Sequence, residues 1–375
     1  MRLAPDLMDR SPPPTSRRQH RRHALLSTLA LLAAPWLPRS TFAQSPVANA
    51  SESDVASMPS YADSPRVTEL AAQLAQQTGL NPKWIAGQLG RAQFQPDVAR
   101  LIIPGKPGQK NWAAYRKHFV ETTRIRAGSD FVQEFGVWLS KAENRFGVDP
   151  AIITGILGVE TIYGRDMGNF RVLDALTTLS LDFPTAAPKN RSGYFSCQLG
   201  DYLLWCHQND FDASKVKGSY AGAIGMPQFM PGNILRYALS FDGGSKVDII
   251  ENPADAIGSV GNFLAGHGWQ RKQPTYFPLV VPNSIAPDAL ARLLEPDIVP
   301  SFTAQQLKAA GFSLPSRVLD YEGKLAVVQL PNANGEPDYI LGTDNFYVVT
   351  RYNHSALYAL AVIELGNAAL AAAQT

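Results

Sequence analysis

Apolar positions spaced three and four residues apart run through most of the central chain. This spacing places one apolar stripe along a helix. Asp149 followed by Pro150 is the usual order of an N-cap and a first helical residue, so another helix begins there. We therefore predict a mainly helical body. It covers residues 67–274, with its first helices at 67–78, 82–103 and 130–146.

The pattern changes after residue 274. Short runs rich in β-branched and aromatic residues alternate with two short helical pieces and with turn signals such as Asn334-Gly335, which is typical of strands and hairpins. We predict a small β-containing lobe over 275–350, followed by a C-terminal helix in 351–375 that returns to the helical body. The fold class is therefore α+β, dominated by helices. The predicted strands are 276–281, 325–330 and 345–351.

A leader precedes the predicted fold. The basic stretch RRQHRRH (17–23) is followed by an apolar run and then by small residues at 40–43, which is the order of a secretory signal peptide. The apolar run is about half of the roughly 20 residues that a membrane-spanning helix needs, so no stable membrane anchor is expected. We predict a signal peptide over 1–43, of the ordinary or twin-arginine type. The Ser-, Ala- and Pro-rich stretch 44–66 is predicted to be a flexible linker.

The composition is that of a globular protein with a slightly acidic body. The 375 residues are 45% hydrophobic and 18% charged, enough apolar material for two or three lobes. The formal net charge is +2, but residues 1–43 carry seven arginines against two aspartates, so the rest of the chain carries −3. This balance provides no basic surface for nucleic acid.

The two cysteines are not expected to form a disulfide. Cys197 and Cys206 both fall in one predicted helix, 194–207, where a rise of about 1.5 Å per residue separates them by roughly 13 Å. A disulfide needs Cα atoms closer than about 7 Å. Two free, mostly buried thiols and no metal site are therefore expected.

Glu160 is the residue that does not fit its surroundings. In the helix after Asp149 it follows Ile156 by four positions and Leu157 by three, which places it on the apolar stripe. Burial there would raise the pKa of its carboxyl, as a general acid working near neutral pH requires. The periodicity leaves an alternative open, in which the end of the helix is exposed and Glu160 faces water.

The sequence around Glu160 resembles that of a known family. GILGVETIYGRDMG (155–168) resembles the catalytic motif of the membrane-bound lytic murein transglycosylases of the B type. Further blocks follow in the family's order, so the resemblance extends from about residue 67 to the C-terminus. They are WAAYRKHF (112–119), RVLDALTTLSLDFP (171–184), GSYAGAIGMPQFMP (218–231), DAIGSVGNFLAGHGW (255–269) and TRYNHSALYALAV (350–362).

This resemblance implies a lysozyme-like fold and a function. Members cleave the β-1,4 bond between N-acetylmuramic acid (MurNAc) and N-acetylglucosamine (GlcNAc) in peptidoglycan without water, leaving a 1,6-anhydro end. Glu160 would be the acid and then the base, and no cofactor would be required. A hydrolysing muramidase on the same scaffold and a non-catalytic peptidoglycan-binding protein remain alternatives. The implied partner is the glycan strand, with other cell-wall enzymes as further candidates, and a monomer is expected.

The matching blocks also imply substrate-binding residues. Each has a structural alternative: Ser219 could be a turn or helix cap, Phe229 a core residue, Tyr352 and Asn353 a turn after a strand, and the aromatics of 112–119 a helix core stripe. The residues carried over are Tyr115, Arg191, Ser219, Gln228, Phe229, Phe263, Tyr352 and Asn353.

The chain departs from the family pattern at three places. A pair of arginines is reduced to Arg191, and a groove tyrosine is replaced by Phe263. The loop 240–248 resembles an EF-hand-like calcium loop, but Ser240 and Gly244 stand where acidic ligands are expected. Because calcium takes six to eight oxygens, an ordinary surface loop is the default interpretation. The remaining candidate ligands are Asp242, Asp248, Glu251 and Asp255.

Overall fold

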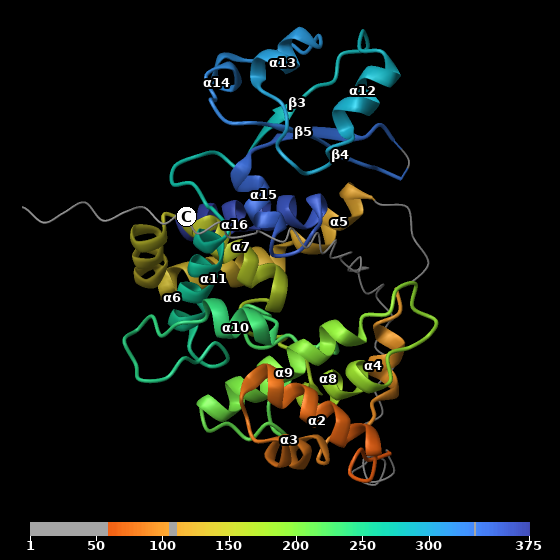
Figure 1. Cartoon of the computed structure of the whole chain (residues 1–375). Coiled ribbons are helices and arrows are strands. Elements are labelled where there is room, and N and C mark those ends of the chain that lie inside the picture. The colour runs from red at the N-terminus through yellow and green to blue at the C-terminus, as the bar shows by residue number, and fades with distance from the viewer. Residues whose placement is uncertain (1–58, 105–110, 334) are drawn as a thin grey trace, which may run out of the picture. The chain divides into compact units, whose positions relative to one another are not determined.

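Residues 59–104, 111–333 and 335–375 are described by a computed structural model of the chain. As predicted, helices dominate, and the strands form two small antiparallel sheets (Figure 1). The predicted signal peptide, residues 44–58 of the predicted linker and Asn334 of the predicted turn lie outside the described residues.

The first half of the chain is helical. Its elements are α2 (Pro65–Thr78), α3 (Pro82–Leu89), α4 (Pro96–Leu101), α5 (Trp112–Phe119), α6 (Thr122–Phe146), α7 (Pro150–Thr161), β1 (Phe170–Arg171), α8 (Val172–Leu181) and α9 (Ser192–Gln208). The second half contains β2 (Lys217–Gly218), α10 (Pro231–Tyr237), α11 (Pro253–Gly266), β3 (Tyr276–Leu279), α12 (Pro287–Leu294), α13 (Ala304–Ala309), α14 (Ser316–Leu319), β4 (Ala326–Leu330), β5 (Asp338–Gly342), α15 (Asp344–Thr350) and α16 (Ala356–Ala373).

Local capping sets several helix ends where the sequence predicts them. Asn81, Asp149 and Asn252 each accept a hydrogen bond from the backbone N–H two residues on, and a proline follows each of them. Gly147 ends α6 at φ 75°, a left-handed conformation that glycine adopts without strain. These short-range signals are therefore sufficient to place the start of α7.

Two predicted helix boundaries are wrong. The helix predicted over 82–103 is broken into α3 and α4, because the backbone N–H groups of Gln93 and Gln95 bond to side chains of α8 rather than within a helix. The helix predicted from residue 130 begins at Thr122, where Glu121 caps its first N–H groups. Both boundaries are set by hydrogen bonds, to α8 in one case and from the Glu121 cap in the other, which the spacing of apolar residues does not reveal.

The predicted linker extends too far. Tyr61 is 4% exposed, and its hydroxyl donates to Asp182 at 2.6 Å. Helix α2 then begins at Pro65. Residues 59–66 therefore belong to the folded body, because the buried Tyr61 ring is held by a hydrogen bond to a residue 121 positions further along the chain.

Helices α7 and α16 pack together at the centre of the helical body. Almost every residue of α7 is buried, and α16 contacts both α7 and α6 (Figure 1). A Cβ on Gly155 would overlap the carbonyl of Val362, and one on Gly366 would overlap the carbonyl of Ala151. The two glycines therefore allow an unusually close approach of the two backbones.

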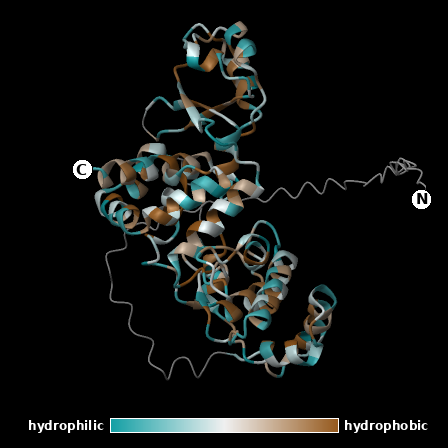
Figure 2. Ribbon diagram, turned by 90° about the vertical axis from the view of Figure 1, so that its left-hand side faces the viewer, coloured by the Kyte–Doolittle hydropathy of each residue, from teal (hydrophilic) through white to brown (hydrophobic). Residues whose placement is uncertain are grey.

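Helix α16 is a core helix. Among the described residues, it is the one helix long and apolar enough to cross a membrane, yet more than half of it is buried inside the fold. Hydrophobic and hydrophilic residues both occur along the helices (Figure 2).

The three-stranded sheet, in the order β3-β5-β4, is buried on both faces. Ala326, Val328 and Leu330 join the main core. Val327 and Leu341 join a second core that includes residues of α13 and α14 (Figure 1). The sheet therefore separates the small lobe's own core from the core of the helical body.

One predicted strand is a helix. Residues 345–351 read as β-rich, but α15 occupies 344–350. Thr343 caps it, and the fully buried Asn345 donates to the backbone oxygens of Gln270 and Gln273. Phe346 belongs to the main core. Tertiary hydrogen bonds and burial override the β propensity of this segment.

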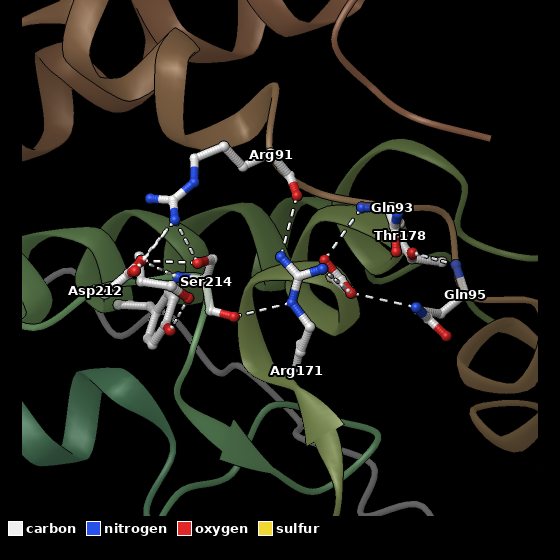
Figure 3. A network of polar contacts seen from close by, with 10 residues as sticks. Arg91, Gln93, Gln95, Arg171, Thr178, Asp212 and Ser214 are labelled. Carbon is white, nitrogen blue, oxygen red and sulfur yellow. Dashed lines mark hydrogen bonds and ion pairs between the residues drawn. The ribbon is translucent and has the colours of Figure 1, made fainter. Parts of the chain in front are cut away.

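A polar network joins the segment 91–95 to α8 and to the loop 212–214 (Figure 3). Asp174 is fully buried and accepts from the Gln93 backbone at 3.1 Å and the Gln95 side chain at 3.2 Å. Arg171 lies 3.3 Å from the same carboxylate. Arg91 pairs with Asp212 at 2.9 Å. The network ties the N-terminal helices to the helical body.

Both cysteines are free, as predicted. Cys206 is buried, but Cys197 is exposed, so the prediction of two buried thiols is wrong for Cys197. The two residues lie on different faces of α9.

Candidate active site

Glu160 lies in the last turn of α7 and lines a cavity of about 210 Å³. The turn that follows is tight, because Ile162 and Tyr163 both adopt positive φ, at 52° and 57°. Glu160 is partly exposed to the cavity, while the residues before it in α7, apart from Pro150, are buried. Of the two alternatives left open by the periodicity, the structure therefore favours the one in which Glu160 lies on the buried stripe, with its carboxyl at a cavity.

Two influences act on the Glu160 carboxyl. Burial raises its pKa from 4.5 to about 7, and the hydrogen bond from Tyr358 lowers it. The Tyr358 hydroxyl donates to Oε1 at 2.6 Å. Burial is the larger influence, because it disfavours the charged form. The carboxyl can therefore hold a proton near neutral pH and release it to a substrate.

Aromatic side chains form one wall of the cavity. The Tyr352 ring lies 4.8 Å from Phe263 and 5.9 Å from Phe229, measured between ring centroids. Tyr352 also stacks on Tyr358 at 6.4 Å. The Tyr352 hydroxyl donates to the Pro227 carbonyl at 2.5 Å, which fixes the ring. Such a wall suits the apolar faces of sugar rings.

The loop 219–230 contributes much of the rest of the lining, and Phe229 of the aromatic wall belongs to it. Thr161, next to Glu160, donates to the Met226 carbonyl at 2.9 Å, so α7 holds the loop directly. Gln228 has φ 51°, and its amide nitrogen donates to the carbonyls of Met167 and Gly225. Ser219 accepts from the Ala223 N–H at 3.0 Å. The strained backbone at Gln228 is maintained by these bonds.

The structure brings most of the sequence-predicted site residues together. Tyr115 does not line the cavity: it is buried on α5, where burial and the charge of Glu160 raise its pKa. Arg191 does not line it either, because its guanidinium lies over the rings of Tyr194 and Phe195. The predicted residues that line the cavity are Glu160, Ser219, Gln228, Phe229, Phe263, Tyr352 and Asn353.

Tyr358 is the residue that sequence reasoning missed. It lies in the first turn of the apolar helix α16 and is 2% exposed, like a core residue. Its position six residues after Tyr352 in a matching block is the signal that could have indicated it. Asn233 also lines the cavity and was not predicted.

Carboxylates of the calcium-loop candidates are hydrogen-bonded within the loop. Asp242 accepts from the Gly244 N–H and from the Asn252 amide, and Asp255 is fully buried and accepts from the N–H groups of Phe241 and Asp248. Among the described residues, no group of three or more acidic, His or Cys side chains could hold a metal ion. Asp242 and Asp255 therefore act as acceptors for backbone N–H groups of their own loop.

Comparison with known proteins identifies the family. The model of the transglycosylase SLT domain matches residues 62–367. The membrane-bound lytic murein transglycosylase B of Escherichia coli is 35% identical over 317 residues, covering 82% of this chain and 83% of that protein. The chain belongs to the SLT-domain transglycosylases. It is an enzyme of the lytic transglycosylase type that acts on peptidoglycan.

Solved structures confirm the lysozyme-like fold of this transglycosylase. Soluble lytic transglycosylase SltB1 of Pseudomonas aeruginosa is 32% identical with a TM-score of 0.74, covering 83% of this chain and 100% of that one. E. coli Slt35, solved in complex with calcium, is 33% identical with a TM-score of 0.73, covering 84% and 96%. P. aeruginosa SltB3, in complex with NAG-anhNAM-pentapeptide, is 26% identical with a TM-score of 0.68, covering 80% and 78%.

Proposed function

We propose that this transglycosylase cleaves the MurNAc-β-1,4-GlcNAc bond without water, with Glu160 as acid and then base, and leaves a 1,6-anhydroMurNAc end. One observation carries the proposal: a carboxyl whose pKa is raised to about 7 lies in an aromatic-walled cavity with a phenol donating to it. The ligand named for SltB3 contains an anhydro sugar of this kind, which supports the same product here.

The proposed reaction has two proton transfers through one group. Protonated Glu160 first donates its proton to the glycosidic oxygen as the C1–O bond breaks and GlcNAc leaves as an alcohol. The resulting carboxylate then takes the proton from the muramyl C6 hydroxyl, whose oxygen attacks C1 and closes the anhydro ring. Glu160 ends protonated, so the cycle is balanced without water.

The lining of the cavity supports a single-carboxyl mechanism. Among the described residues that line it, Glu160 is the one acidic side chain, whereas retaining and inverting glycosidases use two carboxyl groups. The substrate's own acetamido group would then stabilise the cationic centre at C1. The Asn353 amide, on the cavity wall, can donate to and accept from that acetamido group.

Digestion of purified sacculi tests the proposal directly. We expect mass spectrometry to find muropeptides one water lighter than their reducing-end equivalents, and Glu160→Gln to abolish their release while glycan binding and folding are retained. Glu134→Gln is the matched control, because Glu134 is exposed on α6. Reducing-end products would instead establish the muramidase alternative, and wild-type protein that binds sacculi without cutting them would establish a non-catalytic binding protein.

We propose export to the periplasm, where peptidoglycan is available. The leader-like pattern in residues 1–43 supports this location, as does the cell-wall activity named for the relatives. The glycan strand is the proposed partner, other cell-wall enzymes are further candidates, and a monomer is expected.

We propose that neither catalysis nor folding requires calcium. Asp242, Asp248 and Asp255 already accept hydrogen bonds within the loop. Since an ion that binds the folded state raises its stability, we expect neither EDTA nor excess calcium to move the thermal unfolding midpoint or the rate on sacculi. A higher midpoint with calcium would contradict this, and excess magnesium is the matched control.

A further inference from the structure

Four basic side chains gather at one end of the candidate active site. Arg351 and His354 flank Tyr352 and Asn353, which line the cavity. The His267 ring lies 4.1 Å from Phe263, another lining residue, measured between ring centroids. Arg236 follows the lining residue Asn233 by three positions on α10. We call these four residues the basic cluster.

The basic cluster has little compensating negative charge. Burial holds the pKa of His267 below its ordinary value against a hydrogen bond to the Phe263 carbonyl, and the charges of Arg351 and Arg236 lower it further, so the two arginines carry the positive charge of the cluster. Burial and the charge of Arg351 also hold the pKa of His354 below its ordinary value. In the described part of the chain, none of the four forms an ion pair with a carboxylate. The charge of Arg236 also acts on Asp201: burial raises the pKa of that carboxyl, and a hydrogen bond from Gln77 and then Arg236 oppose the rise.

Arg351 is the member held most firmly. Its guanidinium lies 3.9 Å from the centroid of the Tyr347 ring, and one N–H donates to Thr350 at 3.0 Å. Its Nε is buried and has no hydrogen-bond partner among the described residues. The buried Nε is out of reach of a ligand, so an anion would contact the terminal N–H groups of this partly buried side chain.

Within the described parts of the chain, the cavity lining itself supplies no cation. The side chains that line it include no lysine, arginine or histidine among the described residues. Arg191, the cation carried over from the family pattern, lies against two rings outside the lining. Muramic acid is the sugar of the strand that carries carboxylates, either its own lactyl group or those of an attached peptide.

We propose that the basic cluster, with Arg351 at its centre, binds a carboxylate carried by a muramic acid residue of the bound strand. The planar guanidinium matches a carboxylate with two parallel hydrogen bonds. Exposed Arg236 and His354 complete the site from the solvent side. This inference rests on the proposed function and adds to it a determinant of substrate specificity.

Binding measurements with three ligands test the inference. A Glu160→Gln background keeps each ligand uncut. The ligands are a GlcNAc oligomer without carboxylates, a GlcNAc-MurNAc oligomer with free lactyl groups, and the same oligomer carrying stem peptides. We expect Arg351→Gln to weaken the carboxylate-bearing ligands about tenfold, the scale of a lost charged hydrogen bond, and to leave the GlcNAc oligomer unchanged. Arg351→Lys should retain part of the affinity.

Comparison of the two carboxylate-bearing ligands identifies the source of the carboxylate. Loss of affinity for the free-lactyl oligomer alone assigns it to the lactyl group, loss for the peptide-bearing oligomer alone assigns it to the peptide, and loss for both shows that either carboxylate occupies the site. Arg100→Gln is the control, since Arg100 is exposed and pairs with Asp97 on α4. Equal loss for all three ligands, or no loss for any, overturns the inference. If Arg351→Gln does not fold, Arg236→Gln, at an exposed position, is measured with the same three ligands and is expected to weaken only those that carry carboxylates. Sacculus digestion by the wild type tests the proposed function separately, so either can fail alone.

Discussion

Glu160 shows how one residue can be tuned by its immediate surroundings. Burial raises the pKa of its carboxyl to about 7, and the Tyr358 hydroxyl works in the opposite direction. A carboxyl that must first give and then take a proton works best when its pKa lies near the operating pH. We therefore expect activity to fall as pH rises through about 7, because the protonated form is lost.

Tyr358→Phe tests this balance. Removing the hydroxyl removes the bond that stabilises the carboxylate, so the pKa of Glu160 should rise and the alkaline limb of the rate profile should move to higher pH. The maximum rate should fall about tenfold, because the carboxyl also loses its orienting partner. Rates on soluble glycan strands across pH provide the measurement. A limb that moves to lower pH would contradict the assignment, and Tyr339→Phe on β5 is the control.

At the scale of elements, the pairing of α7 with α16 places the Glu160 carboxyl next to the Tyr358 hydroxyl. Glu160 lies on one helix and Tyr358 on the other. The distance between the two backbones is set by Gly155 and Gly366, each of which faces a carbonyl of the partner helix. A larger residue at either position must push the helices apart.

Gly366→Ala should therefore destabilise the fold and slow the reaction. We expect a loss of about 1–3 kcal/mol in the free energy of unfolding, the usual scale for overpacking a core. Urea unfolding measures it. Gly87→Ala on α3 is the matched control, because a Cβ there meets nothing within 4 Å, and we expect a gain of about 0.5–1 kcal/mol from helix propensity. Equal stability of the two variants would refute the packing argument.

At the scale of the whole molecule, polar contacts hold distant segments of the chain together. The buried Asp174 joins the segment 91–95 to α8, in the network of Figure 3. Tyr61 and Arg66 bond to Asp182 at the end of the same helix. Burial raises the pKa of Asp174, while Arg171 and two hydrogen bonds oppose that rise. The N-terminal helices depend on these contacts for their place on the fold.

Asp174→Ala should loosen this attachment. The Gln93 N–H and the Arg171 guanidinium would lose a buried acceptor, and we expect a cost of about 3 kcal/mol in the free energy of unfolding. Hydrogen exchange should accelerate at the Gln93 amide. Asp97→Ala, at an exposed ion pair, should cost less than about 1 kcal/mol. Unchanged exchange at Gln93 would show that the network does not hold the segment.

The sequence by itself determined features whose causes lie within a few residues of each other. Asp149-Pro150 and Gly147 mark the ends of two helices through capping alone. The apolar periodicity of α7 placed Glu160 on the buried stripe. The family blocks then predicted six of the other residues that line the cavity.

Only the tertiary structure decided features whose causes lie far apart in the chain. Tyr358 reaches Glu160 across 198 positions, and no periodicity within α16 distinguishes that phenol from a core residue. The segment 345–351 carries a β pattern, yet the buried Asn345 draws it into a helix through bonds to residues 270 and 273. Local spacing records which face of an element is apolar; the partner of each buried polar group is chosen only when distant elements pack together.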